Sequence, residues 1–142
     1  MLKGIPKILS PELLKVLMEM GHGDELVIGD GNFPSAALGK RLVRCDGHGV
    51  PELLDAILKL FPLDNYVQAP VALMAVAAGD TAPTPVIWDT YAGILERHGG
   101  AGVEYMERFA FYERAKAAYA VVATGEGAVY ANVILKKGVV KE

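Results

Sequence analysis

The sequence predicts a single α/β domain with three layers, in which a mostly parallel central sheet carries helices on both faces. Three observations favour this fold. The length of 142 residues suits one compact domain. Short apolar runs typical of strands alternate with segments of helical periodicity, as in βα units. Residues 71–77 are apolar throughout, which is typical of a strand that is covered on both faces.

The first elements are marked by their boundary residues. Ser10 can cap a helix, Pro11 suits its first position, and Gly21 is a natural stop, so a helix is expected over residues 11–20. Apolar runs at 25–29 and 42–45 predict two strands. Pro51 opens a second amphipathic helix over 51–61, and Pro62 follows its end.

The second half continues the alternation. A strand is expected over 71–77, a helix over 88–97, a short strand over 105–108 and a helix over 110–119. Strands at 120–123 and 133–135 flank a turn at 124–127. Because these last two strands lie too close in sequence for a helical crossover, at least one antiparallel or edge element is expected.

Composition restricts the partners and the location. The net charge is −3 and no segment is basic, which argues against nucleic-acid binding. A single cysteine, Cys45, suits a reducing compartment. The N-terminus lacks the apolar stretch of a signal peptide, and no apolar run is long enough to span a membrane. We therefore expect a cytoplasmic protein. Since 52% of residues are hydrophobic, we also expect a homo-oligomer that hides apolar surface between subunits.

His22 lies in the densest polar cluster of the chain, Gly21-His22-Gly23-Asp24. It follows the first predicted helix, whose negative C-terminal end favours the charged imidazolium form. Asp24 and Asp30 bracket the next strand and can add negative potential near the ring. This arrangement suits a general acid. The alternative is that His22 only caps the carbonyl groups at the end of the helix.

Four further positions are candidates for binding polar ligands. Asp30 follows a buried strand, at the end of the sheet where α/β proteins bind ligands, although an Asx turn would also explain it. Arg108 stands at a strand-to-helix junction and could bind two hydroxyl groups or form a surface ion pair. Tyr130 and Asn132 are alternate residues expected to face the same side of a strand, as a hydroxyl-binding pair or as a structural cross-strand pair.

Other site classes find less support. His22, Asp24, Asp30 and His48 could assemble into a metal site, but their spacing matches no recognised zinc or calcium pattern, so no metal site is predicted. The glycine pairs lack the remainder of a dinucleotide or P-loop motif. Cys45 sits in an apolar strand and is interpreted as a core residue.

Taken together, the motifs resemble the L-fucose mutarotase / D-ribose pyranase family. The matching segments span nearly the whole chain in order: 8–14, 21–25, 30–34, 79–80, 108–115, 124–126, 130–132 and 135–139. The run at 108–115, Arg-Phe-Ala-Phe-Tyr-Glu-Arg-Ala, looks like the fucose branch. The resemblance implies an isomerase that interconverts sugar anomers without a cofactor. It places the family's catalytic histidine on His22, and substrate contacts on Asp30, Arg108 and the Tyr130-Ala131-Asn132 segment. It also implies a ring-shaped homo-oligomer, commonly a decamer, with sites near subunit contacts.

The reaction fits these residues. Mutarotation needs one group to take a proton from the anomeric hydroxyl and another to give one to the ring oxygen. We assign His22 as the proton donor, and Tyr130 binds a hydroxyl group or relays the second proton. Two rival hypotheses remain open: a sugar-binding or transport-accessory protein without turnover, and a metal-dependent hydrolase or lyase.

Overall fold

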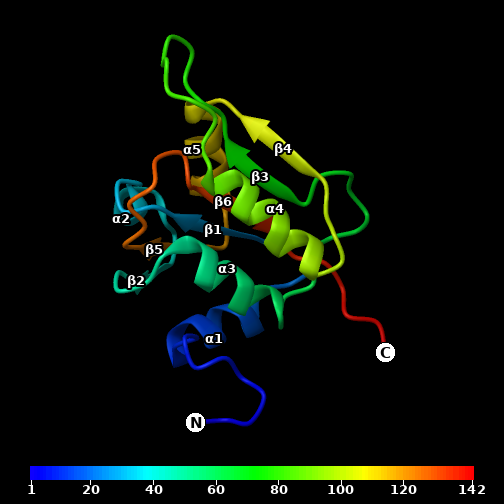
Figure 1. The fold of residues 1–142 in the computed structure, drawn as a ribbon. Coiled ribbons are helices and arrows are strands. Elements are labelled where there is room, and N and C mark those ends of the chain that lie inside the picture. The colour runs from blue at the N-terminus through cyan, green and yellow to red at the C-terminus, as the bar shows by residue number, and fades with distance from the viewer.

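The computed structural model describes all residues, 1–142, and contains one sheet of six strands. In chain order the elements are α1 (Pro11–Glu19), β1 (Glu25–Gly29), α2 (Ser35–Leu38), β2 (Leu42–Cys45), α3 (Val50–Leu58), β3 (Val71–Met74), α4 (Ile87–Arg97), β4 (Val103–Met106), α5 (Arg108–Ala117), β5 (Ala120–Thr124) and β6 (Val133–Lys136). The sheet has the strand order β2-β5-β1-β6-β3-β4 (Figure 1).

Five of the strands run in the same direction, and β6 runs against them. β1 pairs in parallel with β5, β5 with β2, and β3 with β4, whereas β6 is antiparallel to both β1 and β3. The predicted α/β fold and its antiparallel element are therefore confirmed. β6 lies inside the sheet and does not pair with β5.

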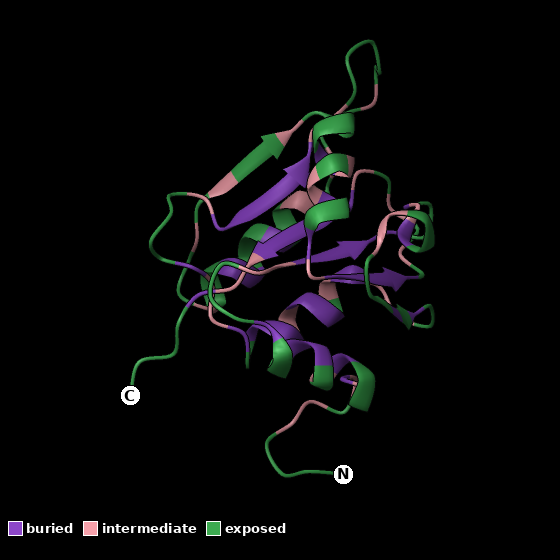
Figure 2. Cartoon of the chain, turned by 180° about the vertical axis from the view of Figure 1, so that it is seen from behind, coloured by how far each residue is buried: buried purple, intermediate pink, exposed green.

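The sheet separates two hydrophobic clusters because successive side chains of a strand point to opposite faces. Leu26 and Ile28 of β1 belong to the larger cluster, which also includes residues of α1, α3 and α4. Val27 points the other way and packs in the cluster of Phe33 and α5. Figure 1 shows α5 on the opposite side of the sheet from α1, α3 and α4. The inner strands are buried, while β4 at one side of the sheet is partly exposed (Figure 2).

Most of the predicted elements exist, with shifted ends. The strand predicted over 71–77 ends at Met74, after which the chain enters a long loop. The helix predicted to begin at residue 110 begins at Arg108, because the Glu107 carboxylate accepts hydrogen bonds from the amides of Phe109 and Ala110. The short helix α2 was not predicted. No helix combines the length and apolar character that crossing a membrane would need.

Candidate active site

Three of the few buried polar side chains meet at one end of the sheet. Asp30 follows β1, Thr124 ends β5, and Asn132 precedes the antiparallel β6. All three therefore lie where the parallel strands have their carboxyl ends, which we call the carboxyl end of the sheet. Buried polar groups are uncommon and need hydrogen-bond partners. Here they join the strand ends: the Thr124 hydroxyl, for example, donates to the Gly29 carbonyl at 2.7 Å.

Asp30 and Asn132 hold each other in place. The Asp30 amide donates to Asn132 Oδ1 at 2.8 Å, and Asp30 Oδ1 accepts from the Asn32 amide at 2.9 Å. This leaves the Asn132 Nδ2 group free to donate to a ligand. Burial raises the pKa of Asp30 above its ordinary value, although backbone amides partly oppose the shift. The predicted Asx turn is thus present.

A cavity of about 270 Å³ opens at this end of the sheet. It gathers four of the predicted binding residues, because Asp30, Arg108, Tyr130 and Asn132 all line it. The remaining lining combines apolar and polar side chains: Asn32, Phe33, Met74, Ala77, Asp80, Tyr112 and Val129. A concave site with a few convergent polar groups is what a small polar ligand requires.

Tyr130 reaches this cavity by a route that the sequence did not indicate. Tyr130 and Asn132 both lie in the loop before β6, not on a strand. Tyr130 has a φ of 55° and is the only non-glycine residue with a positive φ. The prediction that strand alternation pairs the two side chains is therefore wrong, although both line the cavity. The left-handed region is costly for a residue with a large side chain.

Arg108 and Ala131 contribute in different ways. Arg108 is the first residue of α5, at the predicted strand-to-helix junction. Its guanidinium lies 4.5 Å from the centre of the Phe109 ring and forms no ion pair within the chain, so it is available to a ligand. Ala131 is fully buried and does not line the cavity. It acts through its backbone, since its carbonyl accepts a hydrogen bond from the Tyr91 hydroxyl at 2.7 Å.

His22 lies at the other end of the sheet. It precedes β1 whereas Asp30 follows it, and five residues of a strand span about 16 Å. The neighbouring Gly23 amide donates to the Lys137 carbonyl, beyond the far end of β6. The expectation that Asp30 adds negative potential near the His22 ring is therefore wrong. The Asp24 carboxylate accepts a hydrogen bond from the Gly21 amide at 2.7 Å.

The acidic partner of His22 is Asp64. His22 Nε2 lies 3.2 Å from Asp64 Oδ1, and the histidine side chain is 47% exposed whereas that of Asp64 is 5% exposed. The Tyr66 amide, with a further contribution from His22, holds the pKa of Asp64 below its ordinary value. Nε2 is thus the ring nitrogen that contacts Asp64, and Nδ1 has no hydrogen-bond partner within the chain. The Tyr66 ring packs 5.3 Å from the His22 ring.

The suggested metal ligands do not come together. His22 and Asp30 are at opposite ends of β1, and His48 Nδ1 pairs with Glu52 Oε1 at 3.6 Å on the surface. No group of three histidine, cysteine, aspartate or glutamate side chains in the structure is arranged to hold a metal ion. Cys45 is buried, as predicted for a core residue, and burial raises the pKa of its thiol.

Sequence reasoning missed three residues of these sites. Asp64 carried no local signal, since its role depends on the packing of a distant loop. Asp80 occurs in one of the matched segments but was given no role; its carboxylate accepts a hydrogen bond from the Tyr130 hydroxyl. Tyr112 could have been found, because it lies four residues after Arg108 and so shares a face of the helix.

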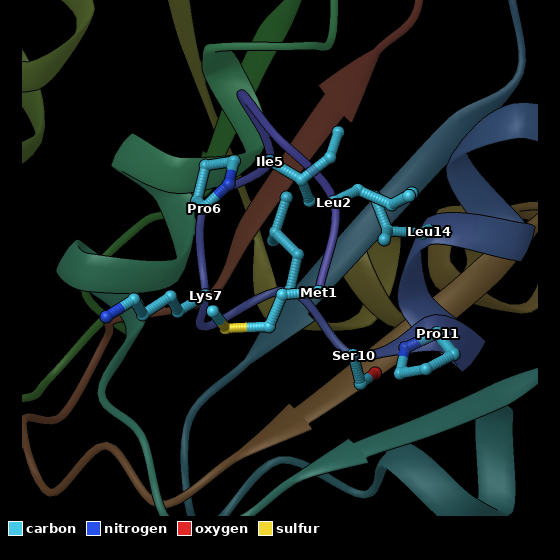
Figure 3. Close-up of a pocket in the computed structure, with 9 residues that line it drawn as sticks. Met1, Leu2, Ile5, Pro6, Lys7, Ser10, Pro11 and Leu14 are labelled. Carbon is cyan, nitrogen blue, oxygen red and sulfur yellow. The ribbon is translucent and has the colours of Figure 1, made fainter.

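A second, mostly apolar cavity of about 540 Å³ lies between the N-terminal residues and α1 (Figure 3). Its only polar side chains are those of Lys7 and Ser10, and none of its side chains is a carboxylate or an imidazole. It therefore lacks the groups that acid–base chemistry on a sugar needs.

Comparisons with known proteins show which family the chain belongs to. A family model described as the RbsD / FucU transport protein family matches residues 3–140. The fucose mutarotase of Bos taurus is 55% identical, over 97% of this chain and 94% of its own length. The L-fucose mutarotase of Actinobacillus pleuropneumoniae serotype 5b (strain L20) is 53% identical, over 98% and 97%. The crystal structure of the fucose mutarotase from Streptococcus pneumoniae in complex with L-fucose superposes with a TM-score of 0.95, at 56% identity over 99% of this chain and 100% of that one. The chain therefore belongs to the RbsD / FucU transport protein family.

Proposed function

We propose that this protein is a mutarotase that interconverts the α and β anomers of L-fucose. The observation that carries the proposal is the cavity at the carboxyl end of the sheet, where Asp30, Arg108, Tyr130 and Asn132 meet. It belongs to a chain 56% identical to a fucose mutarotase whose crystal structure contains L-fucose. The reaction class is carbohydrate isomerisation, within the racemases and epimerases.

The chemistry divides among these groups without a cofactor. Asp30 accepts hydrogen bonds from sugar hydroxyls, and Asn132 Nδ2 and Arg108 donate to others. Tyr130 relays the proton of the anomeric hydroxyl as the bond between C1 and the ring oxygen breaks, and His22 gives a proton to that oxygen. After rotation about C1–C2 the transfers reverse and the ring closes on the other face.

In this mechanism a site must draw on two copies of the chain. His22 cannot reach a sugar in the cavity of its own chain, because β1 separates it from Asp30. We propose that the His22–Asp64 pair of one subunit closes the cavity of the next. Exposed apolar side chains flank both places: Tyr66 and Val67 near His22, and Phe109 and Val129 at the cavity.

Contact between two different patches has a consequence for assembly. Such a head-to-tail interface repeats from copy to copy until it closes into a ring. We propose a ring-shaped homo-oligomer, and a decamer in particular, in agreement with the apolar excess of the sequence. Ten chains of 15.2 kDa give a particle of about 152 kDa. Sedimentation velocity at micromolar concentration tests this, and a monomer would refute the shared site.

We further propose that the protein works in the cytoplasm. The support is Cys45, a buried thiol that forms no disulfide and suits a reducing compartment. Fractionation of cells that make the protein tests the location.

The test of turnover is NMR saturation transfer between the α and β anomeric protons of L-fucose. Faster exchange with the wild-type protein, and loss of the effect in His22→Ala with an intact oligomer, is expected. Saturable L-fucose binding with unchanged exchange would instead support a sugar-binding or transport-accessory role, to which the word transport in the family's description points.

The test of the shared site mixes two inactive variants. His22→Ala and Asp30→Asn are denatured together and refolded into mixed oligomers. If each site takes His22 from one chain and Asp30 from another, about a quarter of the sites recover both native residues. Mixed oligomers without activity, from variants that each assemble normally, would show that the two residues do not serve the same site.

A further inference from the structure

Tyr130 is held in its strained conformation by contacts from three directions. Trp88 Nε1 of α4 donates to the Tyr130 carbonyl at 2.8 Å, and the Tyr91 hydroxyl holds the next carbonyl, that of Ala131. The Ala77 amide donates to the Tyr130 hydroxyl at 3.2 Å. A left-handed tyrosine persists only where its surroundings enforce it, and such residues gather at functional sites.

The contact from Ala77 comes from the loop 75–86 between β3 and α4, which projects beyond the carboxyl end of the sheet (Figure 1). The only carboxylate of this loop belongs to Asp80. Its Oδ2 accepts a hydrogen bond from the Tyr130 hydroxyl, and its Oδ1 accepts one from the Ala82 amide at 2.9 Å. Both Asp80 and Tyr130 line the cavity. The hydroxyl proton of Tyr130 is therefore directed to the loop.

We propose that Asp80 is a positioning residue for the mutarotase reaction, which holds the Tyr130 proton so that the phenol oxygen faces the sugar as a hydrogen-bond acceptor. The inference rests on the proposed function and adds a partner for the second proton transfer. As the anomeric hydroxyl gives its proton to Tyr130 Oη, the phenol gives its own proton to Asp80 Oδ2. His22 of the neighbouring subunit protonates the ring oxygen, and ring closure returns all three protons.

The charge of Asp80 agrees with this role. The hydrogen bonds from Tyr130 and from the Ala82 amide hold the pKa of the Asp80 carboxyl below its ordinary value, so the carboxylate is ionised at neutral pH and accepts the hydrogen bond from the Tyr130 hydroxyl. A neutral phenol that already donates to a carboxylate is a better acceptor through its oxygen than an isolated one, because hydrogen bonds in a chain polarise one another.

The experiment compares Asp80→Asn with Asp80→Ala. The asparagine amide oxygen still accepts from the Tyr130 hydroxyl but cannot take its proton, so kcat for L-fucose exchange is expected to fall at least about tenfold while KM stays unchanged. Alanine also removes the contact that ties the loop to Tyr130, so KM is expected to rise as well. Asp89→Asn is the matched control, since Asp89 is an exposed acid near the start of α4 whose side chain has no hydrogen-bond partner.

A double-mutant cycle with Tyr130→Phe separates this role from a purely structural one. Once the hydroxyl is gone, Asp80→Asn should cause no further loss, because Asp80 acts only through Tyr130. Additive losses, or an Asp80→Asn variant with the kcat of Asp89→Asn, would overturn the inference while leaving the mutarotase proposal intact. A wild-type protein that does not accelerate exchange would refute both.

Discussion

Replacing Tyr91 by phenylalanine removes one oxygen atom from the support beneath the candidate active site. Tyr91 is fully buried in α4, and its hydroxyl donates to the carbonyl of Ala131, itself buried, at 2.7 Å. Burial, with the nearby charges of Glu126 and Asp30, raises the pKa of this phenol well above its ordinary value, so it remains a donor at every working pH. The substitution leaves the Ala131 carbonyl buried without this donor.

The expected loss of stability follows from that lost partner. Stranding a buried acceptor costs about 1–3 kcal/mol. With a urea m-value of about 2 kcal/mol/M, a loss near 2 kcal/mol moves the unfolding midpoint down by about 1 M. L-fucose affinity should fall too, because Ala131 lies between Tyr130 and Asn132. The assay is urea unfolding at one fixed protein concentration, since assembly also affects stability.

The matched control is Tyr119→Phe, which removes a phenol whose hydroxyl donates to Glu19 at 2.6 Å on the exposed surface. Its midpoint should barely move, because water replaces the lost partner. If Tyr91→Phe unfolds at the same midpoint as Tyr119→Phe, the reasoning about the buried carbonyl is wrong.

Three further outcomes are expected. Asp30→Asn should be at least as stable as the wild type at pH 7, because burial disfavours the charge of Asp30, and urea unfolding midpoints that fall in the variant would contradict this. The same variant should bind L-fucose more weakly, which an NMR titration checks. His98 lies 2.8 Å from Asp55 and is the largest cause that lowers the pKa of this carboxyl, so the stability that Asp55 contributes is present above about pH 4 and is lost as pH falls further. Unfolding midpoints measured from pH 3 to 6 should therefore fall less steeply with acid in Asp55→Asn than in the wild type. Arg114→Met should lower the free energy of unfolding by about 3 kcal/mol, because it leaves the half-buried Glu25 carboxylate unpaired. The double variant with Glu25→Met should recover most of this loss, as urea unfolding would show.

The elements of the fold could be predicted because their signals are local. Ser10 and Pro11 mark the start of α1, and the Ser10 hydroxyl does accept from the Leu13 amide. The apolar run of β3 indicated a strand that is covered on both faces, and all four of its residues are buried. Helix ends were less predictable, because α5 begins where the Glu107 side chain happens to reach the first free amides.

The cavity residues could be predicted from local signals, whereas the position of His22 relative to them could not. Asp30 was placed at the carboxyl end of the sheet by its position after a strand, and Arg108 at a strand-to-helix junction. The cavity brings both together with Asn132. His22 was identified as a candidate from its flanking glycines and the end of a helix. These local signals do not show that His22 and Asp30 lie at opposite ends of β1, which depends on the direction of that strand in the sheet.

The sequence by itself determined the fold class, the apolar faces of the helices and strands, and the residue types that acid–base chemistry needs. Those properties follow from periodicity and from side-chain chemistry, which are carried by neighbours in the chain. Only the tertiary structure decided that Asp64 is the partner of His22, that Tyr130 is left-handed with Asp80 on its hydroxyl, and that His22 and Asp30 lie at opposite ends of β1. Each of these depends on contacts between segments that are far apart in sequence, and these positions exist only once the sheet has ordered its strands.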